Sequence, residues 1–326
     1  MTLRAIACLV LLLTAACGEA PPAQAEAEEN PVDYAIAIHG GAGVIPRDID
    51  EETRRGYEEA LRQALELGRS MLEDGKASLD VVEAVIRELE DDPHFNSGKG
   101  AVYTWEGHHE LDASIMDGRD LSCGAVTGVK TVRHPITLAR KVMEETRHVF
   151  LSHQGAETFA DEMGVERVEN SFFDTERRRQ QWRNMRENAE KETGTVGVAA
   201  LDKNGDLAAG TSTGGMTGKR WGRIGDSPVV GAGTYADNRS VAVSCTGTGE
   251  EFIRNVIAYQ VSALMTFKGL SLNEAARQVI HETLKKGDGG LIAVSHSGEI
   301  AMVFNSDGMF RGAADSSGRF EVAIWD

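Results

Sequence analysis

The chain has 326 residues, enough for one large domain or two ordinary ones with a sizeable core. Hydrophobic residues make up 41% and charged residues 26% of the sequence, a balance typical of a soluble globular protein. The formal net charge of −17 argues against nucleic acid as a partner, because nucleic acid selects basic surfaces.

The first 33 residues predict an export signal and a tether. Arg4 precedes an apolar run at residues 5–13, which is too short to cross a bilayer as a helix. The sequence T-A-A-C at 14–17 is similar to a bacterial lipobox and predicts a lipoprotein-like signal peptide over residues 1–17, with lipidation of Cys17. An ordinary secretory signal cut near Ala23 or Ala25 is the alternative. Both interpretations predict an extracytoplasmic protein in the bacterial periplasm, attached to a membrane only through the lipid.

Residues 18–33 contain three prolines and many Ala and Glu, and they are predicted to be a tether that packs against nothing. Residues 34–38 then predict a buried strand that ends in the glycine turn H-G-G-A-G at 39–43.

Two helices are predicted to follow and to cover one face of a sheet. Their apolar stripes have helical spacing and consist of Tyr57, Leu61, Ala64 and Leu65 in the first helix and Val82, Val85, Ile86 and Leu89 in the second. Pro93 ends the second helix, residues 92–100 form a loop, and a further short helix starts at Pro135.

Residues 174–194 change character. They are dense in charge and almost free of aliphatic side chains, so they have little to bury. We interpret this segment as a flexible linker.

Short strands with turn signals predominate after the linker. Residues 196–202 and 206–213 predict a hairpin across K-N-G, because Asn-Gly favours a tight turn. Two helices are expected after residue 247, the second opening with Ser271 and Glu274 as a capping box. The other predicted strands cover residues 229–235, 241–247, 291–295, 299–304 and 321–325. Blocks of strands separate from pairs of helices predict an α+β fold in layers.

The sequence gives no strong signal for a disulfide, a zinc site or a phosphate-binding loop. Cys123 and Cys245 could form a disulfide in an oxidising compartment, although two buried free cysteines are the favoured interpretation. A zinc site is disfavoured for the four polar residues His108, His109, Glu110 and Asp112, because no H-x-x-x-H spacing or third cluster accompanies them. The run T-G-T-G-E at 246–250 lacks the lysine of a phosphate-binding loop.

Glycine-rich motifs follow the junction between linker and strand at Gly194 and Thr195. They are G-T-V-G (194–197), G-T-S-T-G-G-M-T (210–217), G-R-I-G-D-S-P (222–228) and C-T-G-T-G-E (245–250). Each alone is explained by turns, and a β-branched residue that starts a strand is ordinary. Together with H-G-G-A-G (39–43), F-N-S-G-K-G (95–100), H-E-L-D-A-S-I-M-D-G (109–118) and G-D-G-G-L-I (287–292), they resemble the plant-type L-asparaginase and isoaspartyl peptidase family over nearly all of residues 34–326.

The resemblance implies a single N-terminal nucleophile hydrolase domain over residues 34–326, folded as a four-layer αββα sandwich. It implies self-cleavage between Gly194 and Thr195 into fragments 34–194 and 195–326. The freed α-amine, with a pKa of roughly 7.7, could then take the proton of the Thr195 hydroxyl. The implied substrates are L-asparagine and β-aspartyl dipeptides.

Matching motif positions assign further catalytic roles. Thr213 is expected to orient the nucleophile, and Asn96 to position Thr195 and tune its amine. Thr246 and the amide of Gly247 are expected to form the oxyanion hole and to contact the substrate.

The same matching places the amino-acid head of the substrate. Arg223 is expected to hold the α-carboxylate as a bidentate fork. Asp226 is expected to take the α-ammonium with help from the carbonyl of Gly249. The alternative is that Arg223 and Asp226 bind no ligand and form an ordinary surface ion pair.

The resemblance implies no cofactor for catalysis but a structural Na⁺ in the loop at residues 89–99. Its expected ligands are the backbone carbonyls of Leu89, Glu90, Asp92, Phe95, Ser97 and Lys99. It also implies a homodimer of the two-fragment units.

Three alternatives to this function are a related enzyme, glycosylasparaginase, and two proteins of other classes. Glycosylasparaginase usually has an aspartate before the nucleophilic threonine, where this chain has Gly194. A non-cleaving, lipid-anchored solute-binding protein would not need the three hydroxyls of Thr195, Thr213 and Thr246. An anchored structural protein is hard to reconcile with those hydroxyls together with the Arg223 and Asp226 pair.

Overall fold

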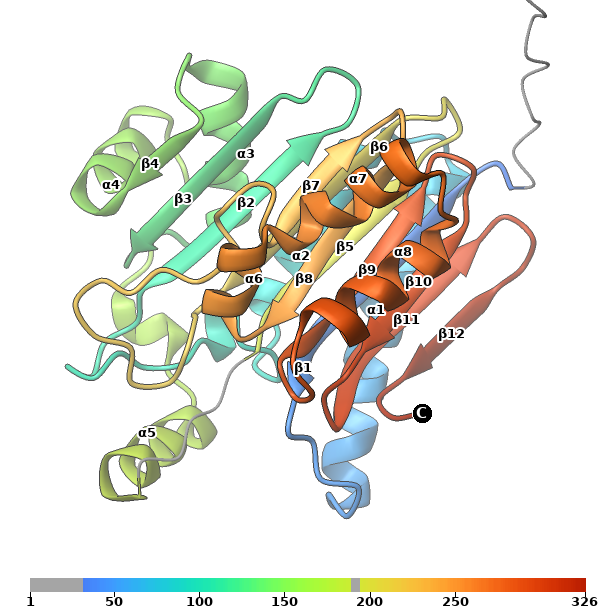
Figure 1. Cartoon of the computed structure of the whole chain (residues 1–326). Helices are drawn as coiled ribbons and strands as arrows, with labels where there is room; N and C mark the ends of the chain where they lie inside the picture. The colour runs from blue at the N-terminus through green and yellow to red at the C-terminus, as the bar shows by residue number, and fades with distance from the viewer. Residues whose placement is uncertain (1–31, 189–193) are drawn as a thin grey trace, which may run out of the picture.

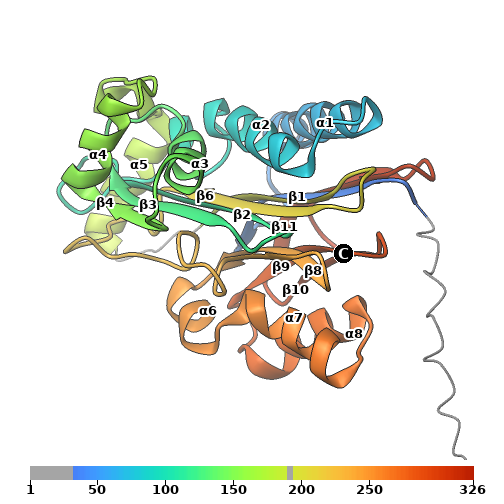
Figure 2. The ribbon, with the colours of Figure 1, turned by 90° about the horizontal axis from the view of Figure 1, so that it is seen from above.

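Two β-sheets lie face to face, and helices cover the outer face of each (Figures 1 and 2). This structure, a computed structural model, describes residues 32–188 and 194–326. The larger sheet has eight strands in the order β12-β11-β1-β5-β6-β2-β3-β4, and the smaller has four in the order β10-β9-β8-β7. The predicted four-layer αββα sandwich is confirmed.

Among the described strands, pairing is antiparallel except between β3 and β4, which run parallel. The larger sheet consists of β1 (Ala35–Gly43), β2 (Leu111–Asp117), β3 (Cys123–Val129), β4 (Phe150–Ser152), β5 (Val196–Leu201), β6 (Leu207–Thr213), β11 (Gly308–Asp315) and β12 (Phe320–Ala323). The smaller consists of β7 (Thr234–Asp237), β8 (Val241–Gly247), β9 (Gly289–Ser295) and β10 (Ile300–Phe304).

Each sheet has its own helical layer. The larger sheet is covered by helices of the first half of the chain, α1 (Glu51–Glu73), α2 (Ser78–Asp91), α3 (Pro135–Glu145) and α4 (His153–Glu162), with α5 (Glu176–Asn188) at one end (Figure 2). The smaller sheet is covered by α6 (Gly249–Asn255), α7 (Ile257–Lys268) and α8 (Leu272–Gln278), the last continuing into a π-helical turn, η3 (Val279–Thr283). Two short 3₁₀ turns, η1 (Gly98–Gly100) and η2 (Asn170–Phe173), lie in the connections.

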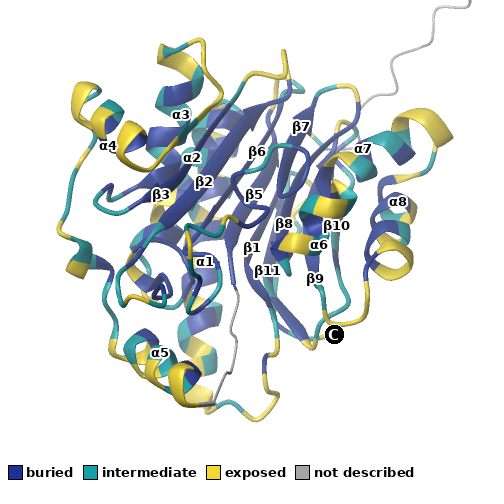
Figure 3. Cartoon of the chain, turned by 60° about the vertical axis from the view of Figure 1, so that its left-hand side comes forward, coloured by how far each residue is buried: buried dark blue, intermediate teal, exposed yellow. Residues whose placement is uncertain are grey.

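Side-chain alternation along the central strands separates two hydrophobic cores. On β1, Ile36 and Ile38 pack in the core under helices α1 and α2, while Ala35 and Ala37 belong to the core that continues between the sheets. Because both of these inner-facing residues are alanines, the smaller sheet can pack close to β1. The central strands are buried on both faces, and the helices keep exposed outer surfaces (Figure 3).

Several predicted elements are confirmed. Strands β5 and β6 pair antiparallel across the K-N-G turn, with Leu201 opposite Leu207. Helix α3 has Pro135 in its first turn. Helix α8 begins with the capping box in which the Ser271 side chain accepts from the Glu274 amide and the Glu274 side chain accepts from the Ser271 amide.

Two predicted boundaries differ from the structure. The strand expected over residues 229–235 begins only at Thr234, because a turn closed by the Val229 and Ala232 backbone occupies the preceding residues. The tether expected over residues 18–33 ends earlier, since Val32 packs against the inter-sheet core and the Asp33 amide donates to Ser316 Oγ at 2.7 Å.

The prediction of a flexible linker over residues 174–194 is wrong for its first part, where residues 176–188 form helix α5. Three side chains fix this helix: the Trp182 ring packs on Tyr103, Met185 is buried against Gly218, and buried Arg178 donates to the Gly100 carbonyl at 2.6 Å. Residues 189–193 lie outside the described residues.

The predicted signal peptide and the lipidation site Cys17 also lie outside the described residues. Over residues 32–188 and 194–326, no helix is both long and apolar enough to cross a membrane.

Candidate active site

Thr195 lies at the start of β5 on the face that looks toward the smaller sheet. The alternation of the strand sets this orientation, because Val196 and Val198 pack under the helices while Ala199 faces the inter-sheet core. The residue is 6% exposed and lines a small pocket. The predicted nucleophile is therefore buried at the edge of a small cavity.

The carbonyl oxygen of Gly194, in the bond predicted to break, is held by two donors. Asn96 Nδ2 donates to it at 2.7 Å and Thr213 Oγ1 at 2.9 Å. The Thr195 hydroxyl lies 2.7 Å from the same oxygen and 3.2 Å from Thr213 Oγ1. Two donors on a carbonyl oxygen stabilise the negative charge that develops there when a nucleophile attacks its carbon.

Both donors are themselves fixed by the backbone. Asn96 Oδ1 accepts from the Val102 amide at 2.9 Å, which defines the orientation of its side-chain amide. Thr213 Oγ1 accepts from the Gly215 amide at 2.9 Å. A Cβ at Gly194 would lie 3.2 Å from the Asn96 Cβ, so a larger residue here would press on the side chain that donates to the carbonyl.

A buried network of polar side chains begins at the Thr195 carbonyl oxygen. His39 Nδ1 lies 3.1 Å from the Thr195 carbonyl oxygen, and His39 Nε2 lies 2.9 Å from Ser244 Oγ. Burial lowers the pKa of His39 to about 3, so the ring is neutral. Since a carbonyl only accepts, Nδ1 carries the proton and Nε2 accepts from Ser244.

The hydrogen-bond network continues between the two sheets. Ser244 Oγ lies 2.7 Å from Thr211 Oγ1, Thr234 donates to Thr211 at 2.6 Å, and Ser114 Oγ lies 2.8 Å from Thr234 Oγ1. Ser114 Oγ donates to the Ser227 carbonyl, next to Asp226, at 2.6 Å. The backbone of the nucleophile is thus linked through hydroxyls to the strand end that carries the substrate-binding candidates.

Thr246 and Gly247 end strand β8 beside this cavity. Thr246 Oγ1 accepts from the Ala42 amide at 3.1 Å, which leaves its own hydrogen for another acceptor. Gly247 lines the cavity with φ +154°, and a Cβ there would lie 2.0 Å from the Asp288 carbonyl oxygen. Only glycine fits this close approach of the two strand ends.

The two predicted binding residues, Arg223 and Asp226, both line the same cavity. Asp226 is 3% exposed, its Oδ2 has no hydrogen-bond partner, and burial raises its pKa to about 7. Arg223 pairs with Glu250 instead, through Nε at 2.9 Å and Nη2 at 2.8 Å. A surface ion pair between Arg223 and Asp226 is therefore not what the structure contains.

Gly249 lies beside both groups, since a Cβ there would be 2.9 Å from Arg223 Nη2 and 3.0 Å from the Asp226 amide. The cavity thus brings the Thr195 hydroxyl together with a guanidinium and a buried carboxyl that has an unpaired oxygen. This arrangement is complementary to a small zwitterionic head.

Sequence comparisons agree with this geometry. A sequence model described as asparaginase matches residues 32–324. The chain belongs to the asparaginase family. It is 52% identical over 292 residues to an isoaspartyl peptidase of Salmonella typhimurium, covering 85% of this chain and 93% of that protein. It is 50% identical to an isoaspartyl peptidase of Escherichia coli (85% and 91% covered) and 41% identical to a human isoaspartyl peptidase/L-asparaginase (90% and 96% covered).

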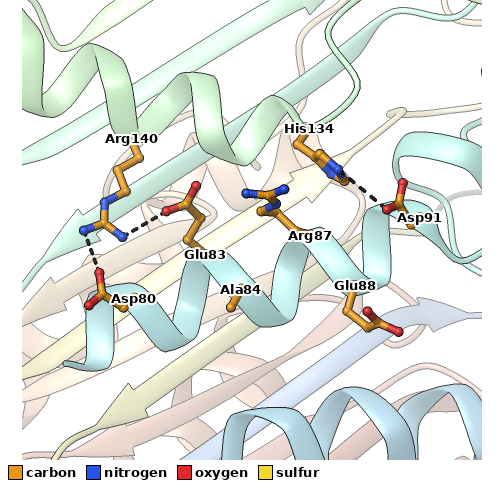
Figure 4. Close-up of a pocket in the computed structure, with 8 residues that line it drawn as sticks. All are labelled: Asp80, Glu83, Ala84, Arg87, Glu88, Asp91, His134 and Arg140. Carbon is orange, nitrogen blue, oxygen red and sulfur yellow. Dashed lines mark hydrogen bonds and ion pairs between the residues drawn. The ribbon is translucent and has the colours of Figure 1, made fainter. Parts of the chain in front are cut away.

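This member of the asparaginase family also has a larger hollow, on its outer helical layer between α2 and α3 (Figure 4). Ion pairs cross it, with Arg140 bound to Asp80 at 2.7 Å and Glu83 at 2.9 Å. Its lining shares no residue with the Thr195 cavity; it consists of Asp80, Glu83, Ala84, Arg87, Glu88, Asp91, His134 and Arg140. We assign the chemistry to the smaller cavity, because Thr195, the predicted nucleophile, lines it.

The buried carboxyl of Glu90 connects this helical layer to the active-site strand. It accepts from Ser212 Oγ at 2.6 Å and from the Ile136 amide at 3.1 Å, and it lies 3.2 Å from His134 Nδ1. Burial raises the pKa of Glu90. Because Ser212 precedes Thr213, this contact fixes the strand that carries a donor to the Gly194 carbonyl.

In the loop predicted to bind Na⁺, the backbone at two glycines passes close to two carbonyl oxygens of the same loop. A Cβ at Gly98 would lie 2.1 Å from the Glu90 carbonyl oxygen, and a Cβ at Gly100 2.1 Å from that of Phe95. Of the carbonyls proposed as ligands, that of Ser97 accepts from the Gly100 amide at 3.1 Å.

Arginines of α5 bind other carbonyls of this loop. Arg177 donates to the His94 carbonyl at 2.6 Å, and Arg178 to that of Gly100. Neither carbonyl is among the proposed ligands. Lys99 is exposed, with its ammonium 5.6 Å over the Phe172 ring.

The polar residues considered for zinc have separate partners. His108 pairs with Glu110 at 3.1 Å, His109 with Asp174 at 3.0 Å, and Asp112 accepts from Thr127. Over the described part of the chain, no group of three or more His, Cys, Asp or Glu is placed to hold a metal ion. Cys123 and Cys245 are free; Cys245 is buried and Cys123 is partly exposed.

Sequence reasoning missed three side chains of this site: His39, Glu90 and Glu250. His39 and Glu250 belong to motifs that the sequence analysis quoted, H-G-G-A-G and C-T-G-T-G-E. Glu90 was considered only for its carbonyl. A buried charge in an apolar helix stripe was the available signal, since such a group needs partners.

Proposed function

We propose that this protein is a threonine hydrolase that activates itself by cutting before Thr195 and then releases L-aspartate from β-aspartyl dipeptides and L-asparagine. The observation that carries the proposal is the Gly194 carbonyl. Its oxygen accepts from Asn96 and Thr213 and lies 2.7 Å from Thr195 Oγ1. The names of its relatives supply the substrate class.

Self-cleavage begins when Thr195 Oγ attacks the Gly194 carbonyl carbon. The C–N bond then breaks, the amine takes the hydroxyl proton, and an ester links Gly194 to Thr195 Oγ. Water hydrolyses this ester, which leaves a Gly194 carboxylate, a free hydroxyl and a free α-amine. The hydroxyl and a suitable base now belong to one residue.

Substrate hydrolysis repeats the attack on a different carbonyl. The α-amine accepts the proton of Thr195 Oγ as the oxygen attacks the side-chain carbonyl carbon of the substrate. Thr246 and the amide of Gly247 stabilise the oxyanion, and the proton passes to the leaving amine. Water then hydrolyses the aspartyl ester and releases L-aspartate.

Substrate orientation follows from the charges in the cavity. Arg223 binds the α-carboxylate, and the unpaired oxygen of Asp226 accepts from the α-ammonium with the Gly249 carbonyl. An ammonium ion would favour ionised Asp226 and so relieve the cost of burying its charge.

Two alternatives are less well supported. Glycosylasparaginase activity is disfavoured by Gly194 and by the names of the relatives above. A non-cleaving solute-binding protein would not need two donors on the Gly194 carbonyl.

The direct test compares the wild type with Thr195→Ala. The wild type should resolve into fragments that end at Gly194 and begin at Thr195, and should release aspartate from a β-aspartyl dipeptide. Thr195→Ala should stay intact and inactive. Wild-type turnover of glycosylated asparagine without turnover of β-aspartyl dipeptides would reverse the choice of substrate.

We further propose a structural Na⁺ in the loop at residues 89–99. Backbone carbonyls are the hard oxygen ligands that such an ion prefers, and the glycines at 98 and 100 press the loop around the carbonyls of Glu90 and Phe95. The ion would brace Asn96, which lies within this loop.

We also propose export, with lipidation at Cys17, and a homodimer of two-fragment units. Support for export comes from the apolar run and T-A-A-C sequence near the N-terminus. Incorporation of labelled palmitate, lost in Cys17→Ala, tests the lipid; sedimentation equilibrium tests the dimer. Activity confined to the cytosolic fraction would overturn export.

A further inference from the structure

Arg223 is held by one acidic side chain at the mouth of the cavity. Its Nε and Nη2 donate to the two carboxylate oxygens of Glu250 at 2.9 and 2.8 Å. Within residues 32–188 and 194–326, these are the hydrogen bonds that the guanidinium makes to other side chains. The Arg223 side chain is 19% exposed and that of Glu250 46%.

This pairing leaves the other edge of the guanidinium for a ligand. Arginine has five N–H donors, and Glu250 uses one on Nε and one on Nη2. The remaining three are on Nη1 and Nη2, and they form a second fork for a carboxylate. Arg223 can therefore bind Glu250 and a substrate carboxylate at the same time.

The unused edge faces the cavity. A Cβ at Gly225 would lie 2.9 Å from Nη1, and a Cβ at Gly215 would lie 3.6 Å from it. Both glycines line the cavity together with Thr195 and Asp226. Because both are glycines, neither places a side chain between Nη1 and the cavity.

The segment that carries Arg223 gives its side chain little other support. Trp221 is 92% exposed with φ +57°, and Gly222 has φ +66°. The Arg223 amide donates to the Arg220 carbonyl at 3.0 Å, and this bond holds the backbone and not the guanidinium. A long side chain on such a turn loses considerable rotamer freedom when a ligand orders it, unless a partner has already ordered it.

We propose that Glu250 is a positioning residue that aims the free edge of Arg223 into the cavity and so makes a free α-carboxylate a requirement for tight substrate binding. It does not touch the substrate. Its carboxylate orders the guanidinium before binding, so the ligand carboxylate meets a fork that is already oriented. The negative charge of Glu250 also balances Arg223, which keeps the head-group site selective for a zwitterion over a plain dianion.

This inference rests on the proposed function, and its test separates the two. The variants are Glu250→Gln, which keeps the volume but breaks the two-oxygen fork, and the matched control Glu251→Gln on the same helix. Glu251 pairs with Arg254 at 2.5 Å on the surface. Calorimetry on the self-cleaved proteins would measure the Kd of L-aspartate and of its α-amide, isoasparagine, and kinetics would give KM and kcat for a β-aspartyl dipeptide.

We expect Glu250→Gln to weaken L-aspartate binding and raise KM by about three- to tenfold, the range for ordering one long side chain. Its kcat and its Kd for isoasparagine should stay close to wild type, because neither depends on the α-carboxylate fork. Glu251→Gln should match the wild type throughout. A merely structural role would weaken both ligands together and lower the melting temperature.

Three results would overturn the inference. Unchanged aspartate binding in Glu250→Gln would make the pair an ordinary surface ion pair. Tighter binding would make Glu250 a competitor that the substrate must displace. Equal weakening of aspartate and isoasparagine would make its role structural. A wild type that hydrolyses no β-aspartyl dipeptide would instead refute the proposed function, whatever the variants bind.

Discussion

The substitution Asn96→Asp tests the role of the two donors on the Gly194 carbonyl. It keeps the oxygen that accepts from the Val102 amide and removes the nitrogen that donates to the carbonyls of Gly194 and Gly215. The change is isosteric, so the surrounding packing should be retained. Only the charge and the donor change.

Its effect on self-cleavage can be scaled from oxyanion holes. Loss of one such donor lowers a rate by about 10²–10³. Thr213 still donates to the Gly194 oxygen at 2.9 Å, so cleavage should slow without stopping. An ionised acid at this position would repel the oxyanion, whereas its protonated form can donate. The rate of the variant should therefore rise toward acidic pH.

The assay follows the intact chain by mass spectrometry over time after purification under conditions that delay cleavage. Asn204→Asp is the matched control, because Asn204 is exposed in the hairpin turn between β5 and β6. It should cleave like the wild type. If Asn96→Asp also cleaved at the wild-type rate at neutral pH, the donor role of Asn96 would be refuted.

Three further predictions concern pH and ions. Burial raises the pKa of Asp226 to about 7 from an ordinary value of about 3.9, so the folded state holds this proton more tightly than the unfolded state. The free energy of unfolding should therefore fall as pH rises from about 4 to 7, by roughly 4 kcal/mol at most. Urea unfolding should show this decline in the wild type and not in Asp226→Asn. Burial lowers the pKa of His39 to about 3 from about 6.5, so the stability that its neutral ring contributes is present above pH 6.5 and is lost as pH falls toward 3. His39→Asn can still donate to the Thr195 carbonyl, and it should lose less stability between pH 7 and pH 4 than the wild type. An equal loss would contradict burial as the cause. Replacement of Na⁺ by choline at constant ionic strength should lower the melting temperature if Na⁺ braces the loop at residues 89–99, and an unchanged melting temperature would remove the ion from the account.

Local patterns predicted an α+β fold in layers, whereas the four-layer sandwich and the role of Thr195 as nucleophile came from the family resemblance. Alternation along β5 and β6 places Thr195 and Thr213 on the same face, and the K-N-G turn fixes their register. Strand β11 escaped prediction because its sequence, G-M-F-R-G-A-A-D, has neither a clear alternation nor a run of β-branched residues.

Contacts between distant segments could not be predicted in the same way. Helix α5 looks like a linker because its charged residues dominate its composition, yet Trp182 and Met185 anchor it to residues far away in sequence. The partner of Arg223 was also missed. Glu250 is 27 residues away along the chain, and only the approach of α6 to the loop before β7 brings the two together.

The measurement closest to the central claim follows aspartate release and fragment masses in the same sample as self-cleavage proceeds. Activity should rise in proportion to the fragment that begins with a free Thr195 amine, and selective blocking of that amine should abolish it. Full activity from a chain in which Gly194 is still joined to Thr195 would contradict the account.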